Sequence, residues 1–191
     1  VILIDQSASV SPEDATLYRA AVGAVIETLR PGDRIALGTI ADRPLGRFVF
    51  ALDAAIKTTG NEIGDRPQEK HVRSTARDAA SRLFASGQRA GHSFILDSLQ
   101  AAAELLKASD HGVKRVVLLT DGREETPETD FTRQKADSAF AGRLLASHRR
   151  SGMIPPLQGV DVYLIGAGGR TSNEYGGLRA FWTTYIQGAG G

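Results

Sequence analysis

The sequence predicts an α/β fold: a three-layer, doubly wound, mostly parallel sheet with helices on both faces. Short apolar runs alternate with longer segments in which apolar residues recur every three or four positions. This alternation of strands and helices is typical of an open parallel sheet. Two of the apolar runs lead into aspartates, Asp5 and Asp121. Because such sheets bind ligands at the carboxyl ends of their strands, the aspartates also indicate where a site would lie.

Five apolar runs are expected to form the sheet, at residues 1–4, 34–39, 45–50, 113–119 and 160–165. The fourth run contains Val-Val-Leu-Leu, a continuous apolar stretch typical of a strand that is covered on both faces. Only a few residues separate the second run from the third. We therefore expect these two strands to be antiparallel and the third to lie at the edge of the sheet.

Five helices are expected between the strands. Ser11 and Asp14 around Pro12 form a capping-box-like start for the first helix, whose buried stripe is expected to include Leu17. Residues 58–67 are expected to form an irregular loop that leads into the second helix. The other helices are expected around residues 72–83, 95–106, 132–148 and 178–185, the last with Phe181, Trp182 and Tyr185 in the core.

Length and composition fit one globular domain over residues 1–191. Hydrophobic residues make up 41% of the chain and charged residues 24%, the balance of a protein with a packed core. The formal net charge of +1 gives no overall attraction to nucleic acid or to anionic lipid. Cysteine is absent, which excludes disulfides, thiolate metal sites and cysteine nucleophiles.

The ends of the sequence bear on its cellular location. No apolar run approaches the roughly 20 residues of a membrane-spanning helix, so we expect no direct membrane insertion by this domain. The chain begins in an apolar strand at Val1, and we therefore expect an upstream segment such as a leader, a lipid anchor or another domain. That expectation favours an exported or membrane-anchored protein over a cytosolic one. The sequence indicates no oligomeric state.

The segment Asp5-Gln6-Ser7-Ala8-Ser9 is the most specific feature of the sequence. Asp5 ends a strand, and the two serines follow at steps of two, so in an extended loop their hydroxyls point to the same side. One carboxylate and two hydroxyls form an all-oxygen half-site. Hard cations such as Mg²⁺ prefer such ligands and keep several waters.

The same residues resemble those of the von Willebrand factor A domains, whose metal-ion-dependent adhesion site has the pattern Asp-x-Ser-x-Ser. The family adds a Thr before a central helix and an Asp after the fourth strand, and here Ser93 and Asp121 match those positions. The resemblance covers nearly the whole chain. It implies the ligand set Asp5, Ser7, Ser9, Ser93 and Asp121, with Mg²⁺ as the cation and Mn²⁺ or Ca²⁺ as alternatives.

The resemblance also implies a function: the open position of the metal accepts an Asp or Glu carboxylate from a protein partner. We therefore expect a binding domain and not an enzyme. Two departures from the family pattern affect the ligands. Ala8 stands where the family has Gly, and Ser93 lacks the methyl group that restricts the rotamer of Thr.

Each motif also has a purely structural interpretation. The Asp5 loop is then a polar connection, Asp121-Gly122 a common turn pair, and Ser93 an N-cap for the following helix. The acidic run of Glu124, Glu125 and Glu128 would be a solvated loop, with only a modest role in partner choice. Residues 166–169 form a Gly-rich turn without the features of a dinucleotide loop. The four histidines show no zinc-binding spacing.

Two other functions remain open on the sequence. A Mg²⁺-dependent phosphotransferase or hydrolase would use Asp5 as its nucleophile, but such enzymes need a second carboxylate two residues later, where this chain has Ser7. Alternatively, the domain is a scaffold whose metal site is idle. Partner specificity is expected to lie in residues 41–44, 58–67, His92 and 122–130, and the sequence does not identify the partner.

Overall fold

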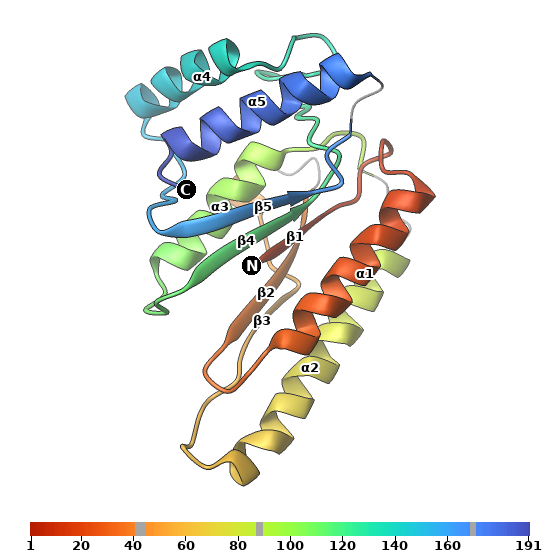
Figure 1. The fold of residues 1–191 in the computed structure, drawn as a ribbon, viewed down its shortest axis with the longest axis vertical. Helices are drawn as coiled ribbons and strands as arrows, with labels where there is room; N and C mark the ends of the chain where they lie inside the picture. Colours follow the sequence, from red (N-terminus) through yellow and green to blue (C-terminus); the bar gives the residue numbers. More distant parts are fainter. Residues whose placement is uncertain (41–44, 87–89, 169–170) are drawn as a thin grey trace.

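A computed structural model describes residues 1–40, 45–86, 90–168 and 171–191 (Figure 1). In the described residues the chain forms the elements β1 (Ile2–Asp5), α1 (Pro12–Thr28), β2 (Arg34–Ile40), the 3₁₀ turn η1 (Leu45–Arg47), β3 (Leu52–Ala55), α2 (Glu62–Ala85), α3 (Ile95–Lys107), β4 (Lys114–Leu119), α4 (Ser138–Ser151), β5 (Val160–Ile165) and α5 (Ser172–Gly188). None of the described helices combines the length and the hydropathy needed to cross a membrane.

The five strands form one sheet in the order β3-β2-β1-β4-β5. β1 lies at its centre and runs parallel to β2 and β4, and β4 runs parallel to β5. Only the edge strand β3 is antiparallel, paired with β2. The predicted fold class, a mostly parallel sheet with one antiparallel edge strand, is therefore confirmed.

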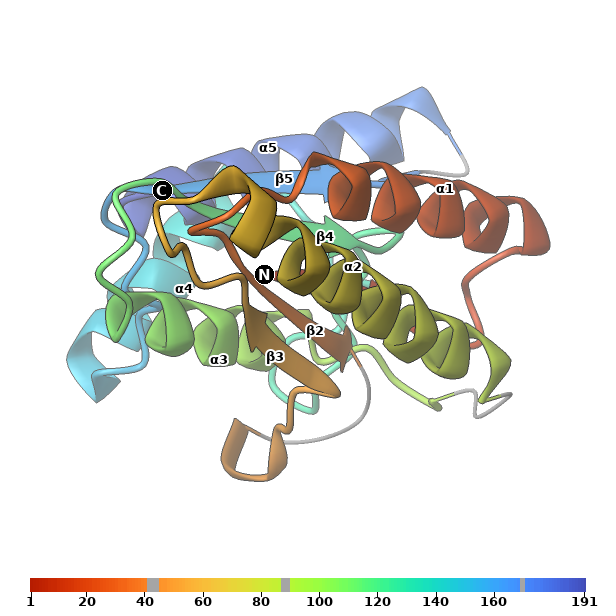
Figure 2. The ribbon, with the colours of Figure 1, turned by 90° about the horizontal axis from the view of Figure 1, so that it is seen from below.

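Helices cover both faces of the sheet, as Figures 1 and 2 show. α1 and α2 lie side by side on one face, and their core includes Ile4 and Tyr18. α3, α4 and α5 cover the other face, where Leu3 and Leu118 point from β1 and β4 into the second core. Successive residues of β1 thus serve opposite faces, which explains why the whole strand is buried.

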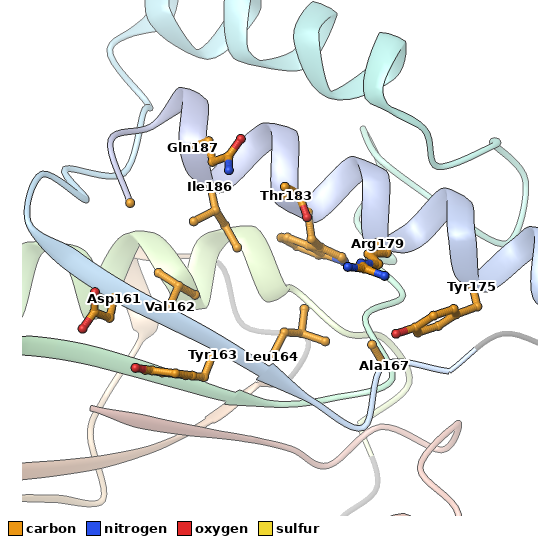
Figure 3. A pocket seen from close by; sticks show the side chains of 12 residues that line it. Asp161, Val162, Tyr163, Leu164, Ala167, Tyr175, Arg179, Thr183, Ile186 and Gln187 are labelled. Atoms are coloured by element: carbon orange, nitrogen blue, oxygen red, sulfur yellow. The ribbon is translucent and has the colours of Figure 1, made fainter.

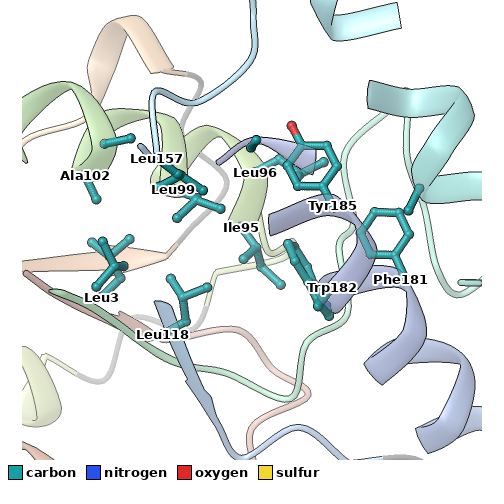
Figure 4. Close-up of a cluster of buried hydrophobic side chains, with 14 of the residues drawn as sticks. Leu3, Ile95, Leu96, Leu99, Ala102, Leu118, Leu157, Phe181, Trp182 and Tyr185 are labelled. Atoms are coloured by element: carbon teal, nitrogen blue, oxygen red, sulfur yellow. The ribbon is translucent and has the colours of Figure 1, made fainter. Parts of the chain in front are cut away.

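The larger core lies between the sheet, α3 and α5 (Figure 4). Leu3 from β1, Ile95 and Leu99 from α3, and Phe181 and Trp182 from α5 are each at most 3% exposed. Full burial of a large apolar side chain stabilises the fold by about 1.5–3 kcal/mol. This core fixes the position of α5, whose predicted buried residues are confirmed.

The start of α1 follows the sequence prediction, but its buried stripe does not. The Ser11 hydroxyl accepts the N–H of Asp14 (3.1 Å) and the Asp14 carboxylate accepts the N–H of Ser11 (3.2 Å), a complete capping box. Leu17, which was expected to be buried, is 47% exposed, and Tyr18 beside it is fully buried. The packing of α1 against α2 and the sheet sets the stripe one residue later than expected.

The third strand was predicted wrongly. The apolar run at residues 45–50 forms the turn η1 and an irregular segment, and β3 follows it at Leu52–Ala55. Phe48 and Phe50 pack edge to face with ring centroids 5.0 Å apart, partly buried against the α3 side of the core. β3 is instead fixed in register by the ion pair between Asp53 and Arg34 (2.6 Å).

The segment at residues 58–67 was predicted to be a loop, yet α2 already begins at Glu62. Asn61 caps this start by accepting the N–H of Ile63 (3.0 Å), and α2 continues through Pro67. A proline inside a helix is costly, so the sequence pattern suggested a boundary. The opposite correction holds for α4, which begins at Ser138 and not near residue 132.

The hydroxyl of Tyr18 has no hydrogen-bond partner among the described residues, although the side chain is 0% exposed. It lies under Gly166, where a Cβ would approach the Tyr18 oxygen to 2.5 Å. A buried hydroxyl without a partner is destabilising. We expect Tyr18→Phe to leave stability unchanged or to raise it by about 1 kcal/mol, measured by urea unfolding. A clear loss of stability would mean that the hydroxyl has a partner, such as a buried water.

Candidate functional site

The five predicted ligand residues gather at the carboxyl ends of the central strands. Asp5 ends β1, and Asp121 follows β4, the parallel neighbour of β1. Ser7 and Ser9 lie in the loop after β1, and Ser93 lies just before α3. Asp5, Ser7, Ser93 and Asp121 are at most 8% exposed. Ser9 is exposed, so it lies at the outer side of the cluster.

Asp5 is the centre of the hydrogen bonds in this cluster. Its Oδ1 accepts the backbone N–H of Ser7 (2.8 Å) and the hydroxyl of Ser93 (3.2 Å). Its Oδ2 accepts the hydroxyl of Thr120 (2.6 Å). The Ser7 and Ser9 hydroxyl oxygens lie 2.8 Å apart, in agreement with the expectation that they share one side of the loop. The loop, α3 and β4 therefore meet at one carboxylate.

Thr120 is a site residue that the sequence reasoning missed. Its hydroxyl donates to Asp5 and accepts the N–H of Gly122 (3.1 Å), so it links the two aspartate loops. Its place directly before Asp121 was a signal that could have been used, although a threonine at the end of a strand has no distinctive pattern. Ser93 does not act as the N-cap of α3, which was its alternative structural role. Phe94 occupies the N-cap position and makes no side-chain capping hydrogen bond.

The two aspartates meet without a basic side chain between them in the described part of the chain. Burial raises the pKa of Asp5, and the charge of Asp121 raises it further, against the hydrogen bonds from Thr120 and Ser7. The nearest basic residue on the loop, Arg123, forms an ion pair with Glu174 (2.7 Å). Two close carboxylates of this kind favour a bound cation.

Glu124 corrects the expectation that the acidic run is solvated. Glu124 is 0% exposed, and its Oε2 accepts the N–H of Leu96 in the first turn of α3 (2.9 Å). Its Oε1 has no partner, and burial raises its pKa well above the ordinary value. Glu124 thus replaces the missing side-chain cap of α3 and ties the Asp121 loop to the helix that follows Ser93.

The other two acids of the run lie nearer the surface. Glu125 is partly buried, and its carboxylate lies 3.7 Å from the ring of His92, which is 64% exposed. His92 is therefore a surface residue beside Glu125. Glu128 is exposed, which fits the solvated interpretation for this residue alone.

Helix α5 supports the Asp121 loop through a hydrogen bond from Trp182. The indole N–H of Trp182 donates to the carbonyl of Gly122 (2.8 Å). Gly122 has a positive φ of 83°, and a Cβ there would come within 3.2 Å of the same indole nitrogen. The N–H of Gly168 donates to the carbonyl of Asp121 (3.3 Å). Glycine at position 122 thus permits both the turn and the close approach of the tryptophan.

The donor set fits a hard divalent cation. It consists of oxygens only, with two carboxylates and three hydroxyls, which is the chemistry that Mg²⁺ prefers. In the part of the chain that the structure describes, no three His, Cys, Asp or Glu side chains form a group that could hold a metal. A cation bound here would therefore depend on the hydroxyls and on water for the rest of its shell. Oδ1 of Asp121 accepts the N–H of Arg123 (3.0 Å).

Two cavities lie away from this cluster. One, of about 480 Å³, lies between β5 and α5 and is lined by Leu164, Tyr175, Arg179 and Trp182 among others (Figure 3). A second, of about 710 Å³, lies between α1 and the sheet at the opposite end of the strands. Neither is lined by the predicted ligands. The candidate site lies at the loops that follow β1 and β4, outside both of these cavities.

The fold agrees with a comparison against protein families: residues 1–124 match the von Willebrand factor type A domain. The match covers most of the chain, and the chain therefore belongs to the von Willebrand factor type A domain family. This family provides protein-interaction domains. No curated protein matches the chain.

Among solved structures, the chain is similar to two crystal forms of proximal thread matrix protein 1 from the mussel byssus. Both are 14% identical to it with a TM-score of 0.47. The similarity covers 98% of this chain but only 46% and 45% of the mussel chains. This chain thus spans less than half of their length. Residues 41–44, one of the segments expected to set partner specificity, lie outside the described residues. Gly169 of the Gly-rich turn also lies outside them.

Proposed function

We propose that this domain binds a divalent cation, Mg²⁺ first, and uses it to bind an acidic side chain of a protein partner. The observation that carries the proposal is the convergence of Asp5 and Asp121 with three hydroxyls, without a basic side chain between the two carboxylates in the part of the chain that the structure describes. When bound, the cation supplies a positive open position that a partner carboxylate can occupy.

The residues of the chain prepare this site in distinct ways. Asp5 and Asp121 bring the negative charge, and Ser7, Ser9 and Ser93 offer neutral oxygens. Thr120 and the N–H of Ser7 orient the Asp5 carboxylate. The three hydroxyls add no charge, so the two carboxylates balance the charge of a divalent cation without exceeding it.

A thermal-shift measurement with Mg²⁺, Mn²⁺ and Ca²⁺ tests the proposal. A cation that binds only the folded state at 100 times its Kd should stabilise it by about 2.7 kcal/mol, or raise Tm by about 5 °C or more. Asp121→Asn should lose this shift. Asp110→Asn, which removes the same charge from an exposed residue before the amino end of β4, at the opposite end of that strand from Asp121, should retain it.

Other results would support other functions. A wild-type Tm that responds to none of the three cations would indicate a scaffold with an idle site. Hydrolysis of a generic phosphatase substrate with Mg²⁺ that is lost in Asp5→Asn would indicate the phosphotransferase. Ser7 in place of a second carboxylate speaks against that outcome.

A further inference from the structure

Glu125 lies beside the candidate cation site without being one of its predicted ligands. Its backbone N–H donates to the carbonyl of Ser93 (3.0 Å), which fixes its position next to that ligand. Its side chain is 17% exposed. Burial raises the pKa of Glu125, and so do the charges of Asp121, Asp130 and Asp5, while His92 lowers it. Glu125 therefore lies beside Ser93, on the loop that follows Asp121.

Little on the chain offsets the negative charge of Glu125. His92, at 3.7 Å, is the neighbouring group that favours it, and that ring is mostly exposed. The other basic residues of this loop are engaged elsewhere: Arg123 pairs with Glu174 (2.7 Å) and Arg133 with Asp130 (3.2 Å). Glu125 thus holds a partly buried carboxylate on the residue that is hydrogen-bonded to Ser93, with the exposed ring of His92 beside it.

The charge count at the site then has a consequence for the partner. Asp5 and Asp121 balance the two charges of a divalent cation, and Glu125 leaves one negative charge in excess. An isolated carboxylate approaching the open position is repelled by that charge. A partner carboxylate with a basic side chain beside it avoids this repulsion, because the basic group forms an ion pair with Glu125.

We infer that the partner segment carries a lysine or arginine next to its acidic residue, and that Glu125 is the residue that selects for it. This inference rests on the proposed function. It assigns different roles to the carboxylates. Asp5 and Asp121 bind the cation, and Glu125 pairs with the basic residue next to the acidic residue of the partner. Glu125→Gln should then have opposite effects on two classes of ligand.

The test uses Mg²⁺-loaded protein and three acetylated, amidated peptides: Ala-Ala-Asp-Ala-Ala, Ala-Lys-Asp-Ala-Ala and Ala-Ala-Asp-Lys-Ala. Binding is followed by ¹⁵N–¹H NMR titration, which detects weak complexes. In the wild type, the better lysine peptide should bind about 3- to 10-fold more tightly than the alanine peptide. In Glu125→Gln, this ratio should fall close to one, because the alanine peptide gains affinity.

Glu128→Gln is the matched control. It removes the same charge from the same loop, but Glu128 interacts with Asp97 and His148 rather than with Glu125. This variant should keep the wild-type ratio. In the wild type alone, raising the salt from about 0.05 to 0.5 M should reduce the lysine preference, which tests the charge effect without any substitution.

The outcomes separate the inference from the proposed function. If Mg²⁺ and the peptides bind but the ratio is the same in the wild type and Glu125→Gln, the inference is wrong and the proposed function stands. A wild type without any lysine preference has the same meaning. If Mg²⁺ does not stabilise the wild type, or binds without any peptide following, the proposed function itself fails.

Discussion

Trp182→Ala is expected to lower the free energy of unfolding by about 3–5 kcal/mol, a large part of the stability of a domain. The ring is 3% exposed and packs edge to face against Phe181 (5.1 Å between centroids), Phe131 and Tyr185. The substitution removes these contacts and leaves a cavity behind. Trp182 is the only tryptophan, so unfolding in urea should be followed by circular dichroism.

Trp182→Phe separates the ring from its N–H group. Phenylalanine keeps most of the apolar contact but leaves the buried carbonyl of Gly122 without its donor. We expect a smaller loss of about 1–3 kcal/mol together with weaker stabilisation by Mg²⁺, because the carbonyl belongs to the residue after Asp121. If Trp182→Phe matched the wild type in both respects, the indole hydrogen bond would not support the site.

Glu124→Gln is expected to raise stability at pH 8 by about 1–3 kcal/mol, because burial opposes the charge that glutamate carries in the unfolded chain at this pH. Glutamine keeps an oxygen for the N–H of Leu96 and carries no charge. In the unfolded chain, Glu124 ionises near its ordinary pKa of 4.5, whereas burial keeps it protonated to a much higher pH in the folded state. The unfolded state then binds fewer protons, so wild-type stability should fall as the pH rises above about 4.5.

The measurement is urea unfolding of both proteins between pH 5 and pH 8. Glu124→Gln cannot ionise, so its stability should fall less over this range. The pKa values of Asp5 and Glu125 are also raised and add the same trend to both proteins. The difference between the two curves therefore reports Glu124, and parallel curves would show that Glu124 does not titrate there.

The order and type of most elements could be predicted from sequence, because the alternation of strands and helices is a local pattern. The failures lie where local pattern and packing disagree. The apolar run at residues 45–50 looks like a strand, but Phe48 and Phe50 pack as a pair against the core. Pro67 looks like a helix boundary, but the cap at Asn61 starts α2 before it. The first outcome depends on contacts with residues far along the chain, whereas the second depends on a local cap, in which Asn61 accepts the N–H of Ile63.

At the candidate site, too, local patterns could be predicted from the sequence and contacts between distant residues could not. Asp5 and Asp121 were predictable because they follow apolar runs, and the strand order brings them together. Thr120 and Glu124 were not, because their roles depend on partners that are distant in sequence: Asp5 for the first and the start of α3 for the second. A buried glutamate in an acidic run has the same local pattern as a solvated one.

The central place of β1 has a consequence for how the protein is made. Ile2 of β1 is in register with Leu37 of β2 and also with Val117 of β4, so β1 is synthesised well before β4, one of its two neighbours in the sheet. Chains fold from the N-terminus as they emerge, at about 5–20 residues per second. Until β4 arrives, one edge of an apolar strand stays open to wrong pairing, and Asp5 has no Asp121 beside it. Cation binding would thus mark only chains that have completed the sheet.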